Sequence, residues 1–285
     1  MAAAVTRPAV GVRRGYCRTM PEQYTHGHHE SVLRSHEKRT VANSAAYLVP
    51  FLQPGLRVLD VGSGAGTITV DLAERVAPGS VTGLDAAADV VEKAAALATQ
   101  RGVENVSFAV GDAYALDAEP GAYDIVHAHQ VLQHLSRPVE ALREFRRVVG
   151  AEGIVAARDV DYAGVIWYPL LPGLDEWHEV YLQVHRAVSG EPAAGRRLKA
   201  WAREAGFADV VSSASFWLFE SPEARDWWGS AWADRALHST FAQHAVGLGI
   251  TDQAGLERIA DGWGEWAAAD DGWFFMPHGE IIARG

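Results

Sequence analysis

The stretch Val58-Leu59-Asp60-Val61-Gly62-Ser63-Gly64-Ala65-Gly66-Thr67 decides the fold of this chain. An apolar run of strand type leads directly into a loop with glycine at every second position, and a helical pattern follows over 68–76. Glycine lets the backbone approach a ligand closely and adopt angles that a side chain forbids. The helix start offers N–H groups without a partner inside the helix. The stretch therefore predicts a strand–loop–helix unit that binds a nucleotide-like cofactor.

The spacing of the glycines separates two kinds of cofactor. The dinucleotide fingerprint places its third glycine three residues after the second, a position that Thr67 occupies here. The third glycine comes earlier, at Gly66, and Asp60 stands two positions before the first. A carboxylate would repel a pyrophosphate but attract an ammonium group. We therefore expect a ligand that carries a positively charged amino group beside the loop and needs no phosphate.

Further strands are predicted along the chain, and their ends carry polar residues. A run over 80–85 ends at Asp85, where an acid typically accepts hydrogen bonds from ribose hydroxyls, and a helical pattern follows. The next strand, over 106–110, leads into Gly111-Asp112-Ala113, a segment suited to an adenine edge. Two more strands are expected over 123–129 and 153–158. Alternation of strands and helices at this spacing predicts a parallel sheet with right-handed crossovers.

Taken in order, the motifs VLDVGSGAGT, VTGLD, VGDA and DIVHAHQVLQHL resemble those of the class I S-adenosylmethionine-dependent methyltransferases. The chain is similar to the ubiquinone/menaquinone-biosynthesis group and to small-molecule, natural-product relatives, over roughly 24–216. The resemblance implies a Rossmann-like α/β fold, with a mostly parallel sheet and an antiparallel last strand. It also implies S-adenosylmethionine as cofactor and S-adenosylhomocysteine as product.

The resemblance assigns roles residue by residue. Asp60 and the glycine loop would hold the methionine part, Asp85 the ribose, and Asp112 with Ala113 the adenine. His129 and Gln130 would line the pocket beside the sulfonium, and an N-terminal Tyr24 would fold over the cofactor. The complete set implied for the cofactor is Tyr24, Asp60, Gly62, Ser63, Gly64, Gly66, Thr67, Asp85, Ala86, Gly111, Asp112, Ala113, His129 and Gln130.

The chain divides into four expected parts. Residues 1–22 are expected to form a disordered extension, 23–220 the core with an N-terminal cap helix, 221–272 a helical lid insertion, and 273–285 the final strand. Within the core, the patterns predict helix signals over 30–51, an irregular loop over 159–172, helices over 174–188 and 195–205, and a sixth strand over 210–219. Six of the ten tryptophans lie at or after position 227, where they would either line an acceptor pocket or pack the lid helices.

The catalytic candidates follow from the chemistry. Methyl transfer is an in-line displacement that needs alignment more than acid–base power, so a base is required only if the acceptor must lose a proton. The candidates are Tyr24, His28, His29 and His134, and the sequence does not separate His28 from His29. His134 would reach the acceptor or pack a helix. The cluster at 26–29 lacks the continuation typical of dinuclear metal sites, so no metal is expected.

Composition narrows the function. A formal net charge of −11 disfavours nucleic acid as partner, and no stretch approaches the roughly 20 apolar residues that span a bilayer. The single cysteine, Cys17, allows no internal disulfide and fits a reducing cytoplasm. We expect a monomer or homodimer that methylates a small apolar or aromatic metabolite, with a leaning to a carbon of an indole or quinol. Alternatives are nitrogen or oxygen methylation, an RNA or protein methyltransferase, and a non-catalytic cofactor-binding module.

Overall fold

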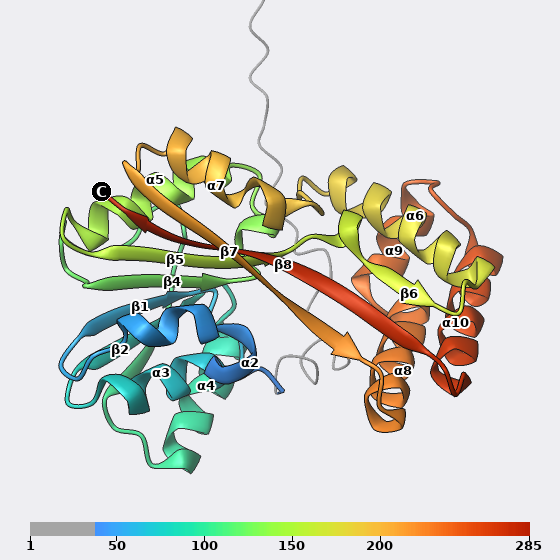
Figure 1. Cartoon of the computed structure of the whole chain (residues 1–285), viewed down its shortest axis with the longest axis horizontal. Coiled ribbons are helices and arrows are strands. Elements are labelled where there is room, and N and C mark those ends of the chain that lie inside the picture. Colours follow the sequence, from blue (N-terminus) through green and yellow to red (C-terminus); the bar gives the residue numbers. More distant parts are fainter. Residues whose placement is uncertain (1–37) are drawn as a thin grey trace, which may run out of the picture.

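The computed structural model describes residues 38–285. The predicted extension over 1–22 and the candidates Tyr24, His28 and His29 therefore lie outside the described residues. Five parallel strands form the half of the sheet that carries the glycine loop, in the order β3-β2-β1-β4-β5 (Figure 1). They are β1 (Arg57–Val61), β2 (Ser80–Asp85), β3 (Val106–Val110), β4 (Ile125–His129) and β5 (Ile154–Val160).

Helices cover both faces of these strands, as a parallel sheet requires. On one face, apolar side chains of the strands pack against α5 (Pro138–Val149) and α7 (Ala194–Glu204). On the other face, they pack against α3 (Thr67–Val76) and the short N-terminal helices. The fourth helix, α4 (Ala88–Arg101), lies against β2 and β3. The predicted Rossmann-like class is confirmed.

The last strand, β8 (Trp273–Arg284), is antiparallel, as predicted, and is much longer than its parallel neighbours. Its carboxyl half pairs with β5, its first three residues pair with β6 (Ile166–Tyr168), and nearly its whole length pairs with β7 (Asp209–Phe219). The irregular loop predicted over 159–172 is therefore wrong in part, because β5 runs on to Val160 and β6 follows. Three residues carry little strand signal of their own, and pairing with β8 supplies what the local pattern lacks.

A helical subdomain, formed by α6, α8, α9 and α10, lies beside the amino-terminal end of β8 (Figure 1). Their bounds are α6 (Pro172–Ala187), α8 (Pro222–His238), α9 (Thr240–Gly247) and α10 (Gln253–Ala268). Four of the six late tryptophans, Trp228, Trp232, Trp263 and Trp266, are buried in its core. Packing is therefore the role of most of them, and the alternative of a tryptophan-lined pocket does not describe these four.

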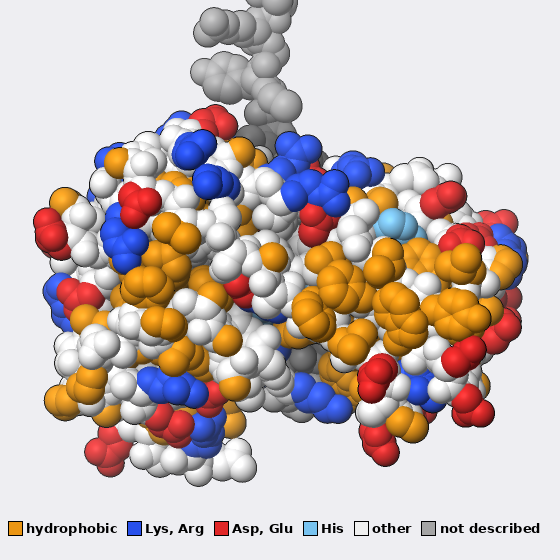
Figure 2. Space-filling view, in the orientation of Figure 1, with side chains coloured by type: hydrophobic (Ala, Val, Ile, Leu, Met, Phe, Trp, Pro, Cys, Tyr) orange, Lys and Arg blue, Asp and Glu red, His pale blue; other side chains and the backbone are white. Residues whose placement is uncertain are grey.

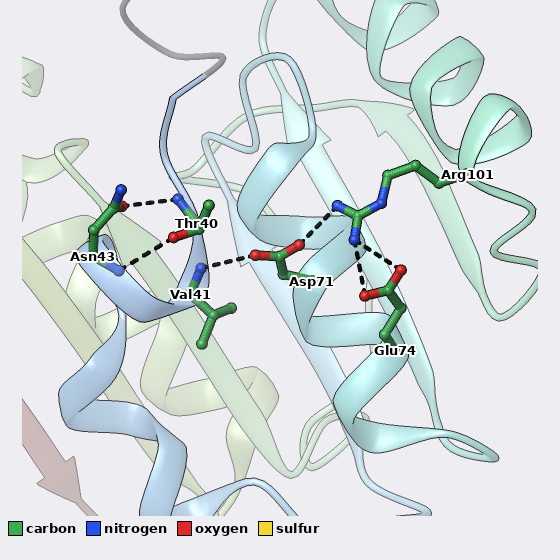
Figure 3. A network of polar contacts seen from close by, with 6 residues as sticks. All are labelled: Thr40, Val41, Asn43, Asp71, Glu74 and Arg101. Carbon is green, nitrogen blue, oxygen red and sulfur yellow. Dashed lines mark hydrogen bonds and ion pairs between the residues drawn. The ribbon is translucent and has the colours of Figure 1, made fainter.

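The N-terminal helices are short and are tied to the core by a network of polar contacts (Figure 3). Asp71 of α3 accepts a hydrogen bond from the Val41 N–H at 3.0 Å and one from Arg101 at 2.7 Å. Thr40 and Asn43 cap α2 (Val41–Ser44) reciprocally. The predicted helical region over 30–51 is thus, in its described part, α2 followed by the 3-10 helix η1 (Ala46–Phe51). Ala45, whose backbone is not helical (φ −141°, ψ 26°), separates them.

The pattern over 130–135 predicts that the next helix opens directly after β4, and the structure differs. A three-residue 3-10 helix, η2 (Leu132–His134), comes first, and α5 begins only at Pro138. A proline disfavours helical angles in the residue before it, and Arg137 is accordingly outside the helical region, with φ −131° and ψ 59°.

The outer face of the β6-β8-β7 extension is apolar and exposed; Figure 2 shows hydrophobic side chains gathered over this part of the molecule. Among residues 38–285, no helix combines the length and apolar character needed to cross a bilayer.

Candidate functional site

The glycine loop between β1 and α3 requires glycine for steric reasons. Gly62, Gly64 and Gly66 have φ of 70°, 55° and 83°, the left-handed region that other residues rarely adopt. A Cβ on Gly62 would collide with Cγ2 of Val131, and one on Gly66 would lie 2.8 Å from Cβ of Ala94. The loop therefore leaves its backbone uncovered by side chains of its own at these positions.

The turn after β2 holds this loop in place. The N–H groups of Gly62 and Ser63 donate to the Leu84 carbonyl at 2.7 and 3.0 Å. Asp85 Oδ2 accepts from the Gly64 N–H at 3.0 Å, and Oδ1 accepts from the Ala87 N–H at 3.1 Å. Each carboxylate oxygen has a further lone pair for a ligand. Asp85 is half-buried and Ala86 is exposed, so the turn borders solvent.

The segment after β3 joins the same turn. The Gly111 N–H donates to the Asp85 carbonyl at 3.0 Å, and the Asp112 side chain accepts from the Tyr114 N–H at 2.9 Å. Three loops predicted from separate motifs therefore meet at the carboxyl ends of β1, β2 and β3. The structure brings together the glycine loop, Asp85 and Gly111, with Asp112 and Ala113 directly after them.

Asp60 is buried beneath the loop and has two protein partners. Its Oδ1 lies 2.7 Å from Nδ1 of His127, and its Oδ2 accepts from the Thr69 hydroxyl at 2.6 Å. Asp60 thus links β1 to β4 and to α3. The sequence analysis did not single out His127. The available signal was its place two residues before His129 on a buried strand, hence on the same face.

A second group of polar residues lies at the carboxyl ends of β4 and β5, on the same face as Asp60. His129, Arg158 and Glu280 are register partners on β4, β5 and β8. We call these three, with Gln130, His278 and the half-buried Trp217, the buried polar cluster. Its members come from four strands and from the residue after β4. Among them, sequence analysis identified only His129 and Gln130.

Aromatic rings surround His129 within the buried polar cluster. The Trp217 ring lies 5.8 Å from that of His129 and 4.7 Å from that of His278, between ring centroids. The Arg158 guanidinium carbon lies 5.1 Å from the Trp217 centroid. The Trp217 indole N–H donates to the Asn43 carbonyl at 2.9 Å. The N-terminal helices therefore help to hold this aromatic group.

His129 is a neutral ring with unused hydrogen-bonding capacity. Burial, followed by the nearby positive charge of Arg158, lowers the pKa of His129 well below its ordinary value. Neither ring nitrogen has a hydrogen-bond partner, although the side chain is buried. Such a group costs folding free energy unless a ligand or water satisfies it.

Gln130 connects the buried polar cluster to the N-terminal segment. Its backbone is in the left-handed region, with φ 55°, which is uncommon for a residue with a side chain. Its Oε1 accepts from Arg39 at 2.9 Å, and its Nε2 lies 2.9 Å from Nε2 of His278. Strained backbone of this kind gathers at functional sites, where the surrounding structure holds it.

His134 lies in a different environment. Its ring centroid is 5.2 Å from that of His185 on α6, and its Nε2 is 3.0 Å from the Gln133 amide. Burial lowers the pKa of His134 well below its ordinary value. These contacts are those of helix packing, and a catalytic role for His134 stays a prediction. Within residues 38–285, no group of three or more potential metal ligands is found.

Asp159, next to Arg158 but on the opposite sheet face, gives a testable dependence of stability on pH. It is fully buried, and burial raises the pKa of its carboxyl to about 8. In an unfolded chain it titrates near 3.9. Between these values the folded protein keeps a proton that the unfolded chain has released, so stability falls as pH rises.

The Asp159→Asn variant, which stays neutral, is expected to lose this slope of up to about 1.4 kcal/mol per pH unit. Urea denaturation between pH 6.5 and 8 measures how the free energy of unfolding depends on pH. This range avoids the contribution of His185, because burial lowers its pKa to about 4 and it gives the opposite slope only below its ordinary pKa of 6.5. Equal slopes in the wild type and the variant would contradict the assignment.

Comparison with known proteins gives consistent matches. A family described as a methyltransferase domain matches residues 52–206. An uncharacterized methyltransferase of Schizosaccharomyces pombe is 33% identical over 273 residues, which cover 92% of this chain and 96% of that protein. A demethylmenaquinone methyltransferase of Lactococcus lactis is 32% identical over 130 residues, 45% of this chain and 49% of that protein. Among solved structures, the [4+2]-cyclase SpnF is 25% identical with a TM-score of 0.53, covering 84% of this chain and 80% of that one.

Proposed function

Because the chain belongs to the S-adenosylmethionine-dependent methyltransferases, we propose that it methylates a small aromatic metabolite at a carbon of an electron-rich ring, such as an indole or a quinol. The observation that carries the proposal is the buried polar cluster, where a neutral His129 with two unpartnered ring nitrogens stands beside the Trp217 and His278 rings. The relative named for demethylmenaquinone supports a small molecule over a polymer.

The residues present fit the cofactor. The glycine loop carries no side chain at Gly62, Gly64 and Gly66, and the Ser63 hydroxyl is buried without a partner. Asp85 has lone pairs left for the ribose, and Asp112 with Ala113 follows for the adenine. Asp60 supplies negative charge beneath the loop, where the methionine ammonium would be attracted. When bound, the cofactor supplies a methyl group on a positively charged sulfur, which leaves as a neutral thioether.

The order of the strands supports a position for the acceptor. The loop after β1 would take the methionine part, and β4 is the next strand, with His129 and Gln130 at its end. β5 and β8 follow with Arg158, His278 and Glu280. An acceptor on the far side of the sulfonium would therefore contact the buried polar cluster. The helical subdomain, proposed as a lid, borders this side of the sheet (Figure 1).

His129 is our candidate for the group that receives the ring proton. When a ring carbon forms its bond to the methyl group, that carbon must lose its hydrogen as a proton. A neutral imidazole nitrogen can accept it. Because burial and Arg158 disfavour the charged ring, the pKa of His129 is lowered, and the ring would release this proton to water and return to its neutral form.

Incubation with S-adenosylmethionine labelled in the methyl group, together with a panel of indoles and quinols, tests the proposal. We expect label on a ring carbon, located by NMR. His129→Gln should lower kcat by about 100-fold or more while changing the affinity for S-adenosylhomocysteine by less than about threefold. His238→Gln, on the exposed side of α8, is the matched control and should retain wild-type kcat.

Two results would contradict the proposal. Label found only on nitrogen or oxygen would replace carbon methylation with its alternatives. Cofactor binding without transfer to any ring acceptor would leave a binding module, or chemistry other than methylation as in the relative named a cyclase.

A further inference from the structure

Arg158 presents two guanidinium nitrogens that the protein leaves without an acceptor. Its side chain is 1% exposed, so water does not replace the missing partners freely. Nη1 and Nη2 are both buried without a hydrogen-bond partner. A buried charged donor that is left unsatisfied is costly, and positions that keep one usually serve a ligand.

The Nε edge of the Arg158 guanidinium already has protein partners. These contacts explain only part of the side chain. Nε donates to the Ser215 hydroxyl at 3.0 Å and lies 3.3 Å from Oε1 of Glu280. Glu280 in turn accepts from the hydroxyls of Ser213 at 2.7 Å and Ser215 at 2.5 Å. The carboxylate is thus held by two serines and meets Arg158 at the Nε edge. Its contacts leave the terminal amino groups of Arg158 unused.

Burial lowers the pKa of Arg158 to about 10, which still leaves the guanidinium charged near neutral pH. The rings of His129 and His278 are neutral, because burial lowers the pKa of each. They therefore supply no negative charge to pair with the guanidinium. The Trp217 ring faces the guanidinium by a cation–π contact, which leaves the N–H groups unpaired. The terminal amino groups are therefore set up for an anionic oxygen.

We propose, resting on the methyltransferase function above, that Nη1 and Nη2 of Arg158 bind a carboxylate of the acceptor. The guanidinium fork matches a carboxylate through two parallel hydrogen bonds, a geometry that a lysine cannot offer. The acceptor is thereby an aromatic acid, with its ring against Trp217 and His129 and its carboxylate toward β5. This revises the expectation of a largely apolar acceptor.

The methionine part of the cofactor also carries a carboxylate, so the strand order decides between the two sources. The glycine loop is on β1, and β4 with His129 lies between β1 and β5. Arg158 is therefore one strand beyond the residues proposed to flank the sulfonium. A carboxylate there belongs to the acceptor side of the transferred methyl group.

The test uses a pair of probes that differ in charge and hardly in shape, indole-3-acetate and indole-3-acetamide. Calorimetry on the full chain saturated with S-adenosylhomocysteine measures both affinities. We expect the acetate to bind about tenfold more tightly than the amide, and Arg158→Gln to remove that difference. Arg158→Lys should restore it only in part, and Arg186→Gln, an exposed control on α6, should keep it.

Equal affinities of the two probes for the wild type would overturn the proposal, as would a preference that survives in Arg158→Gln. The cofactor arm compares S-adenosylhomocysteine with 5′-methylthioadenosine, which lacks the amino-acid part. A loss in Arg158→Gln confined to S-adenosylhomocysteine would assign the carboxylate to the cofactor and overturn the acceptor assignment. Wild type that binds neither adenosine compound would instead refute the proposed function, so the two failures are distinguishable.

Discussion

Replacing Gly66 with alanine is expected to weaken binding of S-adenosylhomocysteine by about 100-fold, or roughly 2.7 kcal/mol. The new Cβ would lie 2.8 Å from Cβ of Ala94 and 3.1 Å from Cζ of Phe108, and φ at this position is 83°. Both the collision and the left-handed backbone oppose a side chain. Relief requires the loop to move away from α4, which disturbs the backbone that would cradle the cofactor. Isothermal titration calorimetry measures the loss.

Gly102→Ala is the matched control for this variant. Gly102 has φ 66°, and a Cβ there would meet nothing within 4 Å. It ends α4, away from the glycine loop. The control should lose about 1 kcal/mol of stability from its backbone and keep wild-type affinity for S-adenosylhomocysteine. Similar affinity losses in Gly66→Ala and Gly102→Ala would show that the loop is not the binding site.

Trp177→Ala is expected to destabilise the helical subdomain by about 3–5 kcal/mol. Trp177 is fully buried at its centre, with ring centroids of Trp232 at 4.8 Å and Trp263 at 4.9 Å. Truncation leaves a cavity bordered by rings of α8, α10 and β8, and collapse of rigid indole rings into it is difficult. Since native stability totals only about 5–15 kcal/mol, the loss is a large share of it. Urea denaturation followed by circular dichroism measures it.

The same variant tests whether the helical subdomain and the half of the molecule built on the parallel strands unfold independently. The core around Trp177 is separate from the two apolar clusters that flank the parallel strands. Trp177→Ala should therefore retain binding of S-adenosylhomocysteine at low temperature. Trp227→Ala, at a partly exposed position of α8, is the control and should cost about 1 kcal/mol. Loss of cofactor binding in step with the helical signal would show instead that the halves fold as one unit.

The parallel half of the fold was predictable because its signals are local. The strands over 80–85 and 106–110 were predicted with the bounds that the structure has, since apolar runs there end in clear turn residues. The prediction failed where a strand forms only through pairing with another strand that is distant in the sequence. β6 has three residues and forms through pairing with β8, more than a hundred residues later in the chain.

The residues of the candidate site also differ in whether local sequence or distant pairing brings them together. The glycine loop and Asp85 belong to contiguous motifs, so the sequence identified them. Arg158 and Glu280 become neighbours only through the pairing of β5 with β8, and their spacing along the chain carries no signal. A hint was present in Arg158 itself, which with Asp159 is one of two ionisable residues in a strand that is otherwise apolar. Charges in such positions are rarely buried without a purpose.

The most direct test of the account is a calorimetric titration of the wild-type protein with S-adenosylhomocysteine and, separately, with NAD. The acid at Asp60 and the early third glycine predict that S-adenosylhomocysteine binds with a dissociation constant on the order of micromolar and that NAD does not bind. Binding of NAD, or no binding of S-adenosylhomocysteine, would contradict the assignment of the glycine loop.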